Sequence, residues 1–301
     1  MNTRQALTQQ LLSLHAAMQT EPACSMAQAQ REDELGLPDE QAAVRQACRI
    51  LGFVPEDVLL LDQAWQCQTR RTGQFSPEKW PDASEDFGVA PWPRDNAFAP
   101  CPQALGLYAV LPDAAWVSRM AQAGVPTVQL RLKSTDMDAV RREVRAAVQA
   151  VKGTNSLLFI NDHWQLAIEE GAYGVHLGQE DMDDAPLDMI RQAGLRLGLS
   201  THGYGELLRA QAASPSYLAL GAVFPTTLKK MKTAPQGLGR LGAYARLMKG
   251  RSLVAIGGID LQAVPAVMRT GVGSIAVVRA LTAADQPEKA AHTFQQAMQA
   301  A

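Results

Sequence analysis

Three polar side chains alternate with apolar residues along one short β-rich run of this chain. In an extended strand, Gln129, Arg131 and Lys133 share one face because side chains point to alternate sides with a period of two. Burying two cations is unfavourable unless an anion meets them. We therefore expect this face to bind an anionic ligand; a solvent-exposed edge strand with long side chains is the alternative.

Two aspartates follow the next two β-rich runs. Asp162 ends the run at residues 157–162, and Asp181 comes just after the run at 174–178. Oxygen ligands suit a hard cation, and Mg²⁺ is commonly held by one or two carboxylates together with phosphate oxygens. The pair therefore predicts a Mg²⁺ site beside the two cations. Helix capping is the alternative for each aspartate alone.

Polar residues and glycines also follow the later runs. Ser200 can donate to a phosphate oxygen, and His202 is either a ligand contact or a loop histidine. Residues 225–239 carry several lysines and read as a loop that closes over an anionic substrate or as a solvated basic loop. Gly257 and Gly258 allow close approach of backbone to phosphate.

The elements that must position these residues are short strands alternating with helices. Eight such units in under 200 residues predict a TIM (β/α)8 barrel, whose active site lies where the strands end. An open doubly wound sheet is the competitor, but no GxGxxG follows the first strand. The expected strands are 106–111, 127–133, 157–162, 174–178, 196–200, 217–224, 253–258 and 274–278, and the expected helices are 114–123, 138–151, 165–170, 205–213, 241–248 and 261–269.

The chain before residue 106 differs in composition from the rest. Acidic residues outnumber basic ones there, and helical periodicity at residues 5–18, 40–51 and 55–68 predicts a small helical region of unknown role at 1–76. Residues 77–105 are rich in proline and read as a linker to the barrel at 106–301. We expect the helices, Trp80 and Trp92 to pack against the barrel exterior or a neighbouring subunit.

Composition excludes several classes of protein. The 301 residues are 47% hydrophobic and 19% charged with a net charge of -2, which excludes a disordered chain, a collagen-like fibre and a polycationic nucleic-acid binder. No apolar run spans a bilayer and no secretory signal begins the chain, so we expect a cytoplasmic protein without a membrane partner. The four widely spaced cysteines predict reduced thiols rather than a zinc cluster or disulfides.

Taken together, these motifs resemble the thiamine phosphate synthase family. The likeness runs in order and at compatible spacing over about residues 106–281, and the ensemble is specific although each piece alone is not. It rests on Gln129-x-Arg131-x-Lys133, Asn161-Asp162, Val175-His176-Leu177-Gly178-Gln179-x-Asp181, Gly198-x-Ser200-Thr201-His202, Phe224-Pro225-Thr226, Lys229 and Ala255-Ile256-Gly257-Gly258-Ile259.

The resemblance implies a Mg²⁺-dependent transferase of thiamine biosynthesis. It would join hydroxymethylpyrimidine diphosphate to hydroxyethylthiazole phosphate, or to the carboxylated form of that thiazole, and release pyrophosphate, with no nucleophilic side chain required. The implied catalytic residues are Arg131, Lys133 and Lys229, and Mg²⁺ would lie on Asp162 and Asp181. The implied substrate-binding residues are Gln129, Asn161 and Ser200 for the pyrimidine diphosphate and Thr226, Thr227, Gly258, Val278 and Arg279 for the thiazole phosphate. A homo-oligomer is also implied.

This chain departs from the family pattern at three positions. Leu228 stands where a second threonine is usual, Arg279 replaces a serine after the eighth strand, and His163 stands where arginine is common. Thr227 can substitute for the missing threonine, and Arg279 can bind phosphate in a bidentate manner. Two other functions remain open: a thiazole tautomerase, in which His202 would transfer a proton, and a non-catalytic protein that binds thiamine precursors.

Overall fold

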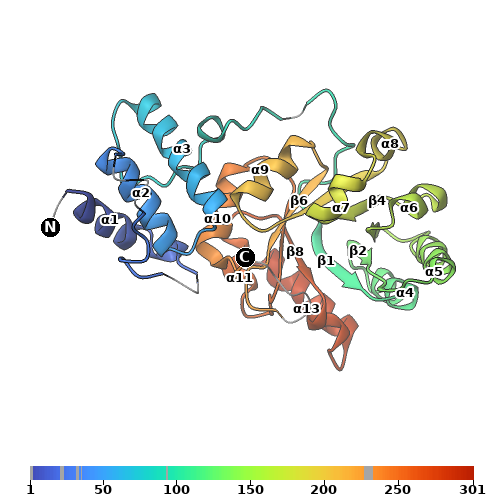
Figure 1. The fold of residues 1–301 in the computed structure, drawn as a ribbon. Helices are drawn as coiled ribbons and strands as arrows, with labels where there is room; N and C mark the ends of the chain where they lie inside the picture. Colours follow the sequence, from blue (N-terminus) through green and yellow to red (C-terminus); the bar gives the residue numbers. More distant parts are fainter. Residues whose placement is uncertain (1–2, 21–23, 32–33, 35, 93, 227–232) are drawn as a thin grey trace.

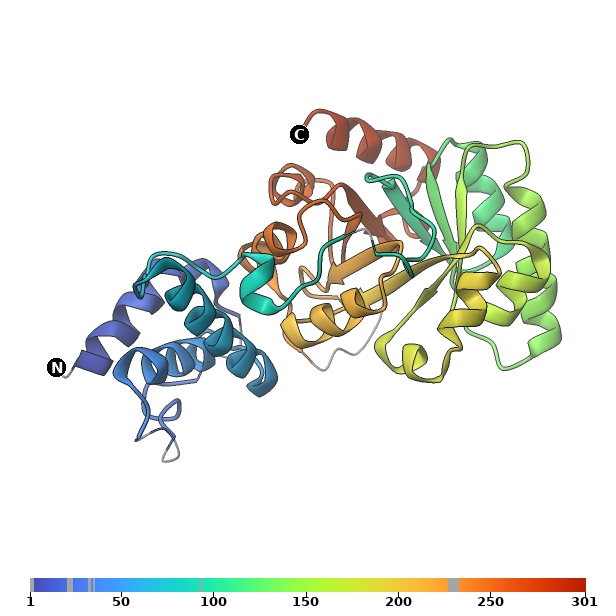
Figure 2. The same ribbon diagram turned by 90° about the horizontal axis from the view of Figure 1, so that it is seen from above.

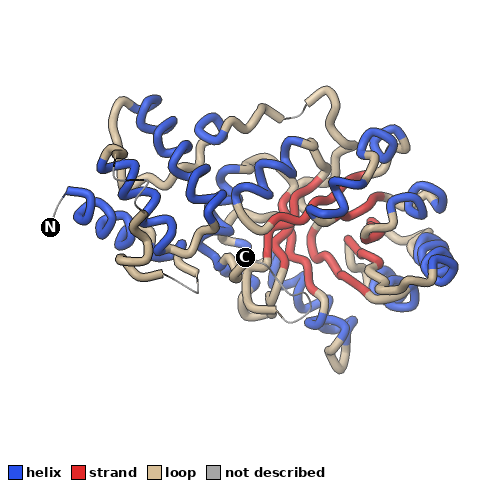
Figure 3. The backbone as a smooth tube through the Cα atoms, viewed as in Figure 1, coloured by secondary structure: helices blue, strands red, loops and turns tan. Residues whose placement is uncertain are grey.

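Eight parallel strands form a closed barrel in the part of the chain that the structure describes (Figures 1 and 3). The computed structural model describes residues 3–20, 24–31, 34, 36–92, 94–226 and 233–301. Strands pair in chain order and β8 pairs with β1, which confirms the expected TIM barrel. The strands are β1 (Gly106–Leu111), β2 (Thr127–Leu130), β3 (Leu157–Asn161), β4 (Gly174–Leu177), β5 (Arg196–Thr201), β6 (Tyr217–Gly221), β7 (Leu253–Ile256) and β8 (Ser274–Val277).

Helices surround this barrel (Figure 3). They are α4 (Ala114–Gln122), α5 (Met137–Ala150), α6 (Trp164–Glu170), α7 (Gln179–Asp184), α8 (Leu187–Gln192), α9 (Tyr204–Ala212), α10 (Gly237–Leu247), α11 (Val264–Met268), α12 (Arg279–Thr282) and α13 (Pro287–Gln299). The six helices expected between strands are present. The sequence did not predict α7, α8, α12 or α13, and the first three have at most 6 residues, too few to show helical periodicity.

Strand β2 is shorter than expected. The period of two was expected to reach Lys133, but the ladder ends with Leu130 opposite Leu111 and Ile160. The last hydrogen bond between the two strands runs from Arg131 N to the carbonyl of Leu111 at 2.7 Å, and β1 itself ends at Leu111. The expected single face of Gln129, Arg131 and Lys133 is therefore wrong as a strand property, because the last two residues lie beyond the strand.

Alternation along the strands separates two apolar clusters. Tyr108, Phe159 and Tyr217 point inward and pack together, with the ring centroids of Phe159 and Tyr217 5.1 Å apart at 83°. Leu107 and Leu111 point outward into the larger cluster that includes the helices. The barrel centre is therefore a packed core, which supports the residues at the strand ends above it.

Gly198 leaves the space that the buried ring of Tyr217 occupies, because a Cβ at this glycine would overlap ring atoms. We expect Gly198→Ala to lower the free energy of unfolding by about 1–3 kcal/mol, the usual cost of overpacking. Urea denaturation measures the change. Gly36→Ala is the control, since a Cβ there would meet nothing within 4 Å. Equal stability of the two variants would contradict the packing argument.

In the described part of the N-terminal region, three α-helices lie beside the barrel (Figure 2). They are α1 (Thr3–Leu14), α2 (Asp39–Ile50) and α3 (Pro55–Thr72), with a short 3-10 turn, η1 (Ala16–Met18), after the first. Pro55 begins α3, and Gly73 ends it with a φ of 81°, the left-handed conformation that glycine adopts readily. The expected helices at 5–18, 40–51 and 55–68 correspond to these elements.

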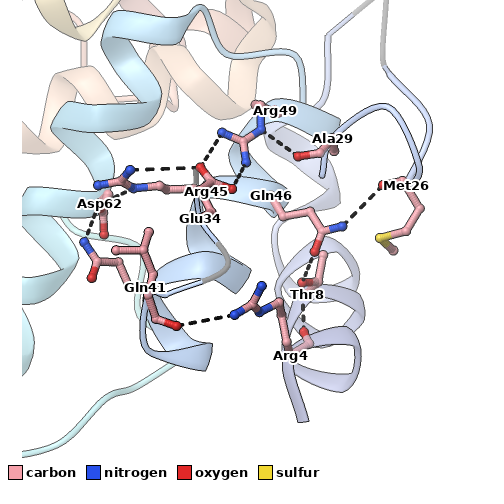
Figure 4. Close-up of polar contacts among 11 residues, drawn as sticks. Arg4, Thr8, Met26, Ala29, Glu34, Gln41, Arg45, Gln46, Arg49 and Asp62 are labelled. Carbon is pink, nitrogen blue, oxygen red and sulfur yellow. Dashed lines mark hydrogen bonds and ion pairs between the residues drawn. The ribbon is translucent and has the colours of Figure 1, made fainter. Parts of the chain in front are cut away.

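A largely buried ionic network ties this helical region together (Figure 4). Glu34, which is 4% exposed, accepts a hydrogen bond from Arg49 Nη1 at 2.9 Å and lies 4.0 Å from Arg45. Arg45 Nε also donates to Asp62 of α3 at 2.6 Å. Removing one partner of such a network leaves a buried charge unpaired, so the network fixes how α2, α3 and Glu34 pack.

The linker residues pack on the barrel exterior, as expected for the two tryptophans. Trp80 Nε1 donates to the hydroxyl of Tyr204 in α9 at 2.8 Å, and the Arg251 guanidinium lies 3.8 Å from the centre of the Trp92 ring. All four cysteines are free thiols in this structure. No helix in the described ranges is both long and apolar enough to cross a bilayer.

Candidate active site

A cavity of about 710 Å³ lies at the carboxyl ends of the barrel strands. Residues from every strand contribute to its wall, so the barrel closure itself brings the strand ends together. Ten of the residues singled out in the sequence line it: Gln129, Arg131, Asn161, Asp162, Asp181, Ser200, Thr226, Gly258, Val278 and Arg279. His202 lines it as well.

Three expected site residues are not placed in this wall. Lys133 is exposed and is absent from the residues lining the cavity, because the chain leaves the sheet after Leu130. Thr227 and Lys229 lie outside the described residues. The roles of these three residues therefore stay predictions.

Two cationic side chains, Arg131 and Arg279, line the cavity. Among the described residues, neither the Arg131 nor the Arg279 guanidinium has a carboxylate within ion-pair distance or a hydrogen-bond acceptor. The other arginines near the barrel wall are often paired, as Arg209 is with Asp183 and Arg145 with Glu170. Uncompensated guanidinium groups at one cavity favour an anionic ligand, for which arginine offers bidentate hydrogen bonds.

Asp162 is held in an unusual backbone conformation at the end of β3. Its φ is 64°, in the left-handed region that Asp and Asn tolerate better than other non-glycine residues. Its N–H donates to the carbonyl of His176 at 3.0 Å, and its own carbonyl accepts from Trp164 N at 2.8 Å. Strain of this kind persists only where surrounding contacts fix it, and it is frequent at functional sites.

Asp181 caps a helix and also lines the cavity. Its Oδ2 accepts a hydrogen bond from Gly178 N at 3.0 Å at the start of α7. Helix capping, the alternative expected for this aspartate, therefore applies to one of its two carboxylate oxygens. The same carboxylate acts on His163: burial lowers the pKa of this imidazole, while the charge of Asp181 opposes the shift. Asp181 thus combines a local structural role with a position in the wall.

The donor set suits a cation that brings its own ligands. Asp162, Asp181 and Asn161 offer oxygen atoms to the same cavity. Within the described ranges, no group of three or more His, Cys, Asp and Glu residues could hold a metal ion. Mg²⁺ is often bound by only one or two carboxylates together with phosphate oxygens and water, so these residues fit it.

A chain of hydrogen bonds across the barrel was not predicted from the sequence. Gln129 Nε2 donates to Tyr108 OH at 3.1 Å, and the hydroxyls of Tyr108 and Tyr217 are 2.8 Å apart. His176 then contacts Tyr217 OH through Nδ1 and Ser200 Oγ through Nε2, each at 2.8 Å. Burial raises the pKa of Tyr217 well above its usual value, so this hydroxyl stays neutral.

This series of hydrogen bonds holds two cavity residues, Gln129 and Ser200, from the inside of the barrel. The two tyrosines lie in apolar runs, where an aromatic residue reads as ordinary core. His176 lies in the fourth strand, within a motif that resembles the family pattern, but the sequence suggested no role for it. Its role, to connect Tyr217 with Ser200, is visible only from its inward position in the barrel.

Tyr217→Phe tests the hydrogen-bond chain. The change removes one oxygen that contacts both Tyr108 and His176, so we expect the free energy of unfolding to fall by about 1–3 kcal/mol. Tyr108→Phe and the double variant complete a cycle measured by urea denaturation. Additive losses, with no coupling between the two tyrosines, would contradict a shared network.

His202 is held beside the cavity by a carboxylate. Its Nδ1 lies 2.6 Å from Glu206 Oε2, one turn later in α9. This contact orients the ring, which leaves the second ring nitrogen as the atom available to a ligand. The geometry is compatible with either a ligand contact or proton transfer.

Comparison with known proteins gives one consistent result. Residues 107–281 match the family described as thiamine monophosphate synthase. A thiamine-phosphate synthase of Neisseria meningitidis serogroup A is 56% identical over 198 residues, which are 66% of this chain and 97% of that relative. One of Photorhabdus laumondii is 52% identical over 187 residues, covering 62% of this chain and 87% of the relative.

Among solved structures, a thiamine phosphate pyrophosphorylase from Pyrococcus furiosus superposes with a TM-score of 0.59 at 28% identity. It covers 65% of this chain and 96% of its own. The aligned 198 residues are nearly the whole of the Neisseria relative but only two thirds of this chain. The remaining third of this chain therefore has almost no counterpart in that relative. The N-terminal helices are therefore an addition to a barrel that occurs without them.

Proposed function

We propose that this chain, which belongs to the thiamine monophosphate synthase family, joins hydroxymethylpyrimidine diphosphate to a thiazole phosphate and releases pyrophosphate. One observation carries the proposal: Arg131 and Arg279, which have no ion-pair partner among the described residues, line the same cavity at the strand ends as Asp162 and Asp181. Such a wall suits a pair of phosphorylated substrates. The thiazole is hydroxyethylthiazole phosphate or its carboxylated form.

The reaction breaks one C–O bond and forms one C–N bond; with the carboxylated thiazole, the carboxyl group must also leave as CO₂ and a proton takes its place. Pyrophosphate leaves the exocyclic methylene carbon of the pyrimidine with the bonding electrons, and the thiazole nitrogen donates its lone pair to that carbon. The electron-rich aminopyrimidine stabilises the positive charge that develops in between. No side chain needs to act as a nucleophile, so the protein contributes mainly by stabilising the leaving group.

Arg131 is the described cation best placed for that task. A fixed positive charge beside the departing diphosphate stabilises the transition state more than the ground state, because negative charge grows as the C–O bond breaks. Lys133 and Lys229 are proposed to add to this effect when substrate is bound. Gln129, Asn161 and Ser200 are proposed to hold the pyrimidine diphosphate through hydrogen bonds.

Asp162 and Asp181 are proposed to hold Mg²⁺ together with diphosphate oxygens. The bound ion would supply charge neutralisation at the leaving group. The two carboxylates are themselves negative and would repel the diphosphate unless a cation lay between them.

The other half of the cavity is proposed to bind the thiazole phosphate. Thr226 follows β6, Gly258 follows β7, and Val278 and Arg279 follow β8, so all four lie on the side of the wall away from β2 and β3. Arg279 would replace a hydroxyl contact with a charge-assisted, bidentate one. Thr227 is proposed to add a further contact. A homo-oligomer and a cytoplasmic location stay predictions.

Purified chain incubated with both substrates and Mg²⁺ tests the proposal. We expect equimolar thiamine phosphate and pyrophosphate, with strongly reduced formation by Asp162→Ala and Lys133→Ala. Binding of both substrates without release of pyrophosphate would refute the proposal and favour a precursor-binding protein. Isomerisation of the thiazole phosphate alone, dependent on His202, would instead identify a tautomerase.

A further inference from the structure

The N-terminal region contacts two particular barrel helices, α9 and α10. They follow β5, whose end carries Ser200, and β6, after which Thr226 lies in the cavity wall. Figure 1 shows α3 beside α9, and η1 packs against α10. We propose that the N-terminal region is a positioning element for substrate binding, in which Asp57 fixes the start of α9 and Arg240 fixes the start of α10. This inference rests on the proposed function.

Asp57 caps α9 from outside the barrel. Its side chain is 3% exposed, and Oδ1 accepts a hydrogen bond from Gly205 N at 2.8 Å. The first N–H groups of a helix need acceptors, and the residue at the α9 N-cap, Gly203, has no side chain to provide one. Burial raises the pKa of the Asp57 carboxyl, while hydrogen bonds from the backbone N–H groups of Gly205 and Tyr204 oppose that shift.

The cap acts close to the substrate cavity. Strand β5 ends at Thr201, and His202 lies between it and the N-cap of α9. Both of these residues and Ser200 line the cavity. A shift of the first turn of α9 therefore moves the wall that is proposed to hold the diphosphate.

Arg240 joins α10 to two helix ends in the N-terminal region. The side chain is 3% exposed; Nε donates to the carbonyl of Met18 at 2.9 Å and Nη2 to that of Leu51 at 2.8 Å. Leu51 is the C-cap residue of α2, where carbonyl groups lack partners within the helix. The guanidinium also lies 3.6 Å from the centre of the Phe53 ring.

The same arginine acts on the segment after β6 through Gln236. Arg240 Nη1 lies 3.5 Å from Gln236 Oε1, which also accepts from Tyr244 OH at 2.9 Å. The backbone N–H of Gln236 donates to the carbonyl of Ala222 at 2.8 Å, and that of Gly237 donates to Val223 at 2.9 Å. Since Ala222 lines the cavity beside Thr226, Arg240 is linked to the proposed thiazole phosphate side.

The two contacts therefore serve different halves of the cavity. Asp57 is linked through the start of α9 to Ser200, on the proposed diphosphate side. Arg240 is linked through Gln236 to Ala222, which lines the cavity together with Thr226. Neither residue lines the cavity, so each is a positioning residue rather than a catalytic one. Small displacements of positioned groups are costly: about 1 Å can reduce rate by about 100-fold.

Steady-state kinetics of full-length variants separates positioning from simple stabilisation. We expect Asp57→Ala to raise KM for the pyrimidine diphosphate about tenfold with a smaller effect on the thiazole phosphate, and Arg240→Met to show the opposite preference. Arg240→Lys should recover part of the loss. Hydrogen exchange should increase at residues 201–208 in the first variant and 236–244 in the second.

Arg246→Met is the matched control. It also removes a contact between α10 and the linker, since Arg246 Nε lies 2.7 Å from Asp82, but this pair is exposed and distant from Gln236 in the helix. We expect wild-type kinetics. Equal losses for both substrates, or a lower Tm with unchanged KM and kcat, would overturn the inference and leave the region a stabilising appendage.

Two milder variants decide the question if Asp57→Ala or Arg240→Met does not fold. Asp57→Asn keeps one oxygen acceptor, and Arg240→Lys keeps the positive charge but loses the planar guanidinium. The same substrate preference supports the inference, and its absence overturns it. If the wild type releases no pyrophosphate, the proposed function fails, and affinity for inorganic pyrophosphate replaces KM: only the Asp57 variant should bind it more weakly.

Discussion

Arg131→Met is expected to lower kcat/KM by about 100- to 1000-fold, the effect of removing one preorganised group that stabilises developing charge. Arg131 lines the cavity, and its guanidinium has no anionic partner among the described residues. Because negative charge accumulates on the leaving diphosphate, most of the loss should be in kcat rather than KM. Steady-state release of pyrophosphate measures the change.

Arg142→Met is the matched control, because this arginine is exposed on α5 and absent from the cavity wall. Its kinetics should equal those of the wild type. Arg131→Lys keeps the charge but loses the planar, bidentate donor, so an intermediate rate is expected. Wild-type kcat/KM for Arg131→Met would contradict the assignment of Arg131 to the leaving group.

The barrel was predictable from the sequence because its strands are short, apolar and regularly separated by helical segments. Each β/α unit carries its own local signal, so errors of a few residues at strand ends do not change the count. Position at a strand end then predicts position at the cavity. Gln129, Asn161 and Ser200 all reach the same wall for this reason.

Residues beyond a strand were less predictable. The alternation of polar and apolar residues suggested that Gln129, Arg131 and Lys133 share one face. The strand ends at Leu130, and of the last two residues only Arg131 lines the cavity. A pattern of side chains does not reveal where the hydrogen-bonded ladder stops, since that depends on where the neighbouring strand, β1, ends. Placement after the ladder is a tertiary property.

Partners from distant parts of the chain were not predictable at all. Tyr108 and Tyr217 are separated by 109 positions, and Asp57 and Gly205 by 148. Each of these residues has a plausible local role, as a core aromatic or a helix residue. Only the closed barrel and the helices packed beside it bring the pairs together.

Asp162→Asn is expected to raise the Mg²⁺ concentration needed for half-maximal rate by at least about tenfold, because the loss of even a supporting residue of a metal site costs 10- to 100-fold in affinity. The variant removes the negative charge of the side chain but keeps its size and shape. Asparagine tolerates the left-handed φ of 64° as aspartate does, so the backbone should keep its conformation. Initial rates across a Mg²⁺ titration, together with Mn²⁺ binding by electron paramagnetic resonance, measure the effect.

Asp181→Asn should act in the same direction, while its remaining side-chain oxygen can still accept the hydrogen bond from Gly178 N. Asp184→Asn is the control for both, since Asp184 is exposed on α7 and absent from the cavity wall. High Mg²⁺ should restore part of the activity of both cavity variants, because diphosphate oxygens remain as ligands. An unchanged Mg²⁺ requirement in both would exclude a shared metal site and leave the two aspartates with the structural roles of a strained turn and a helix cap.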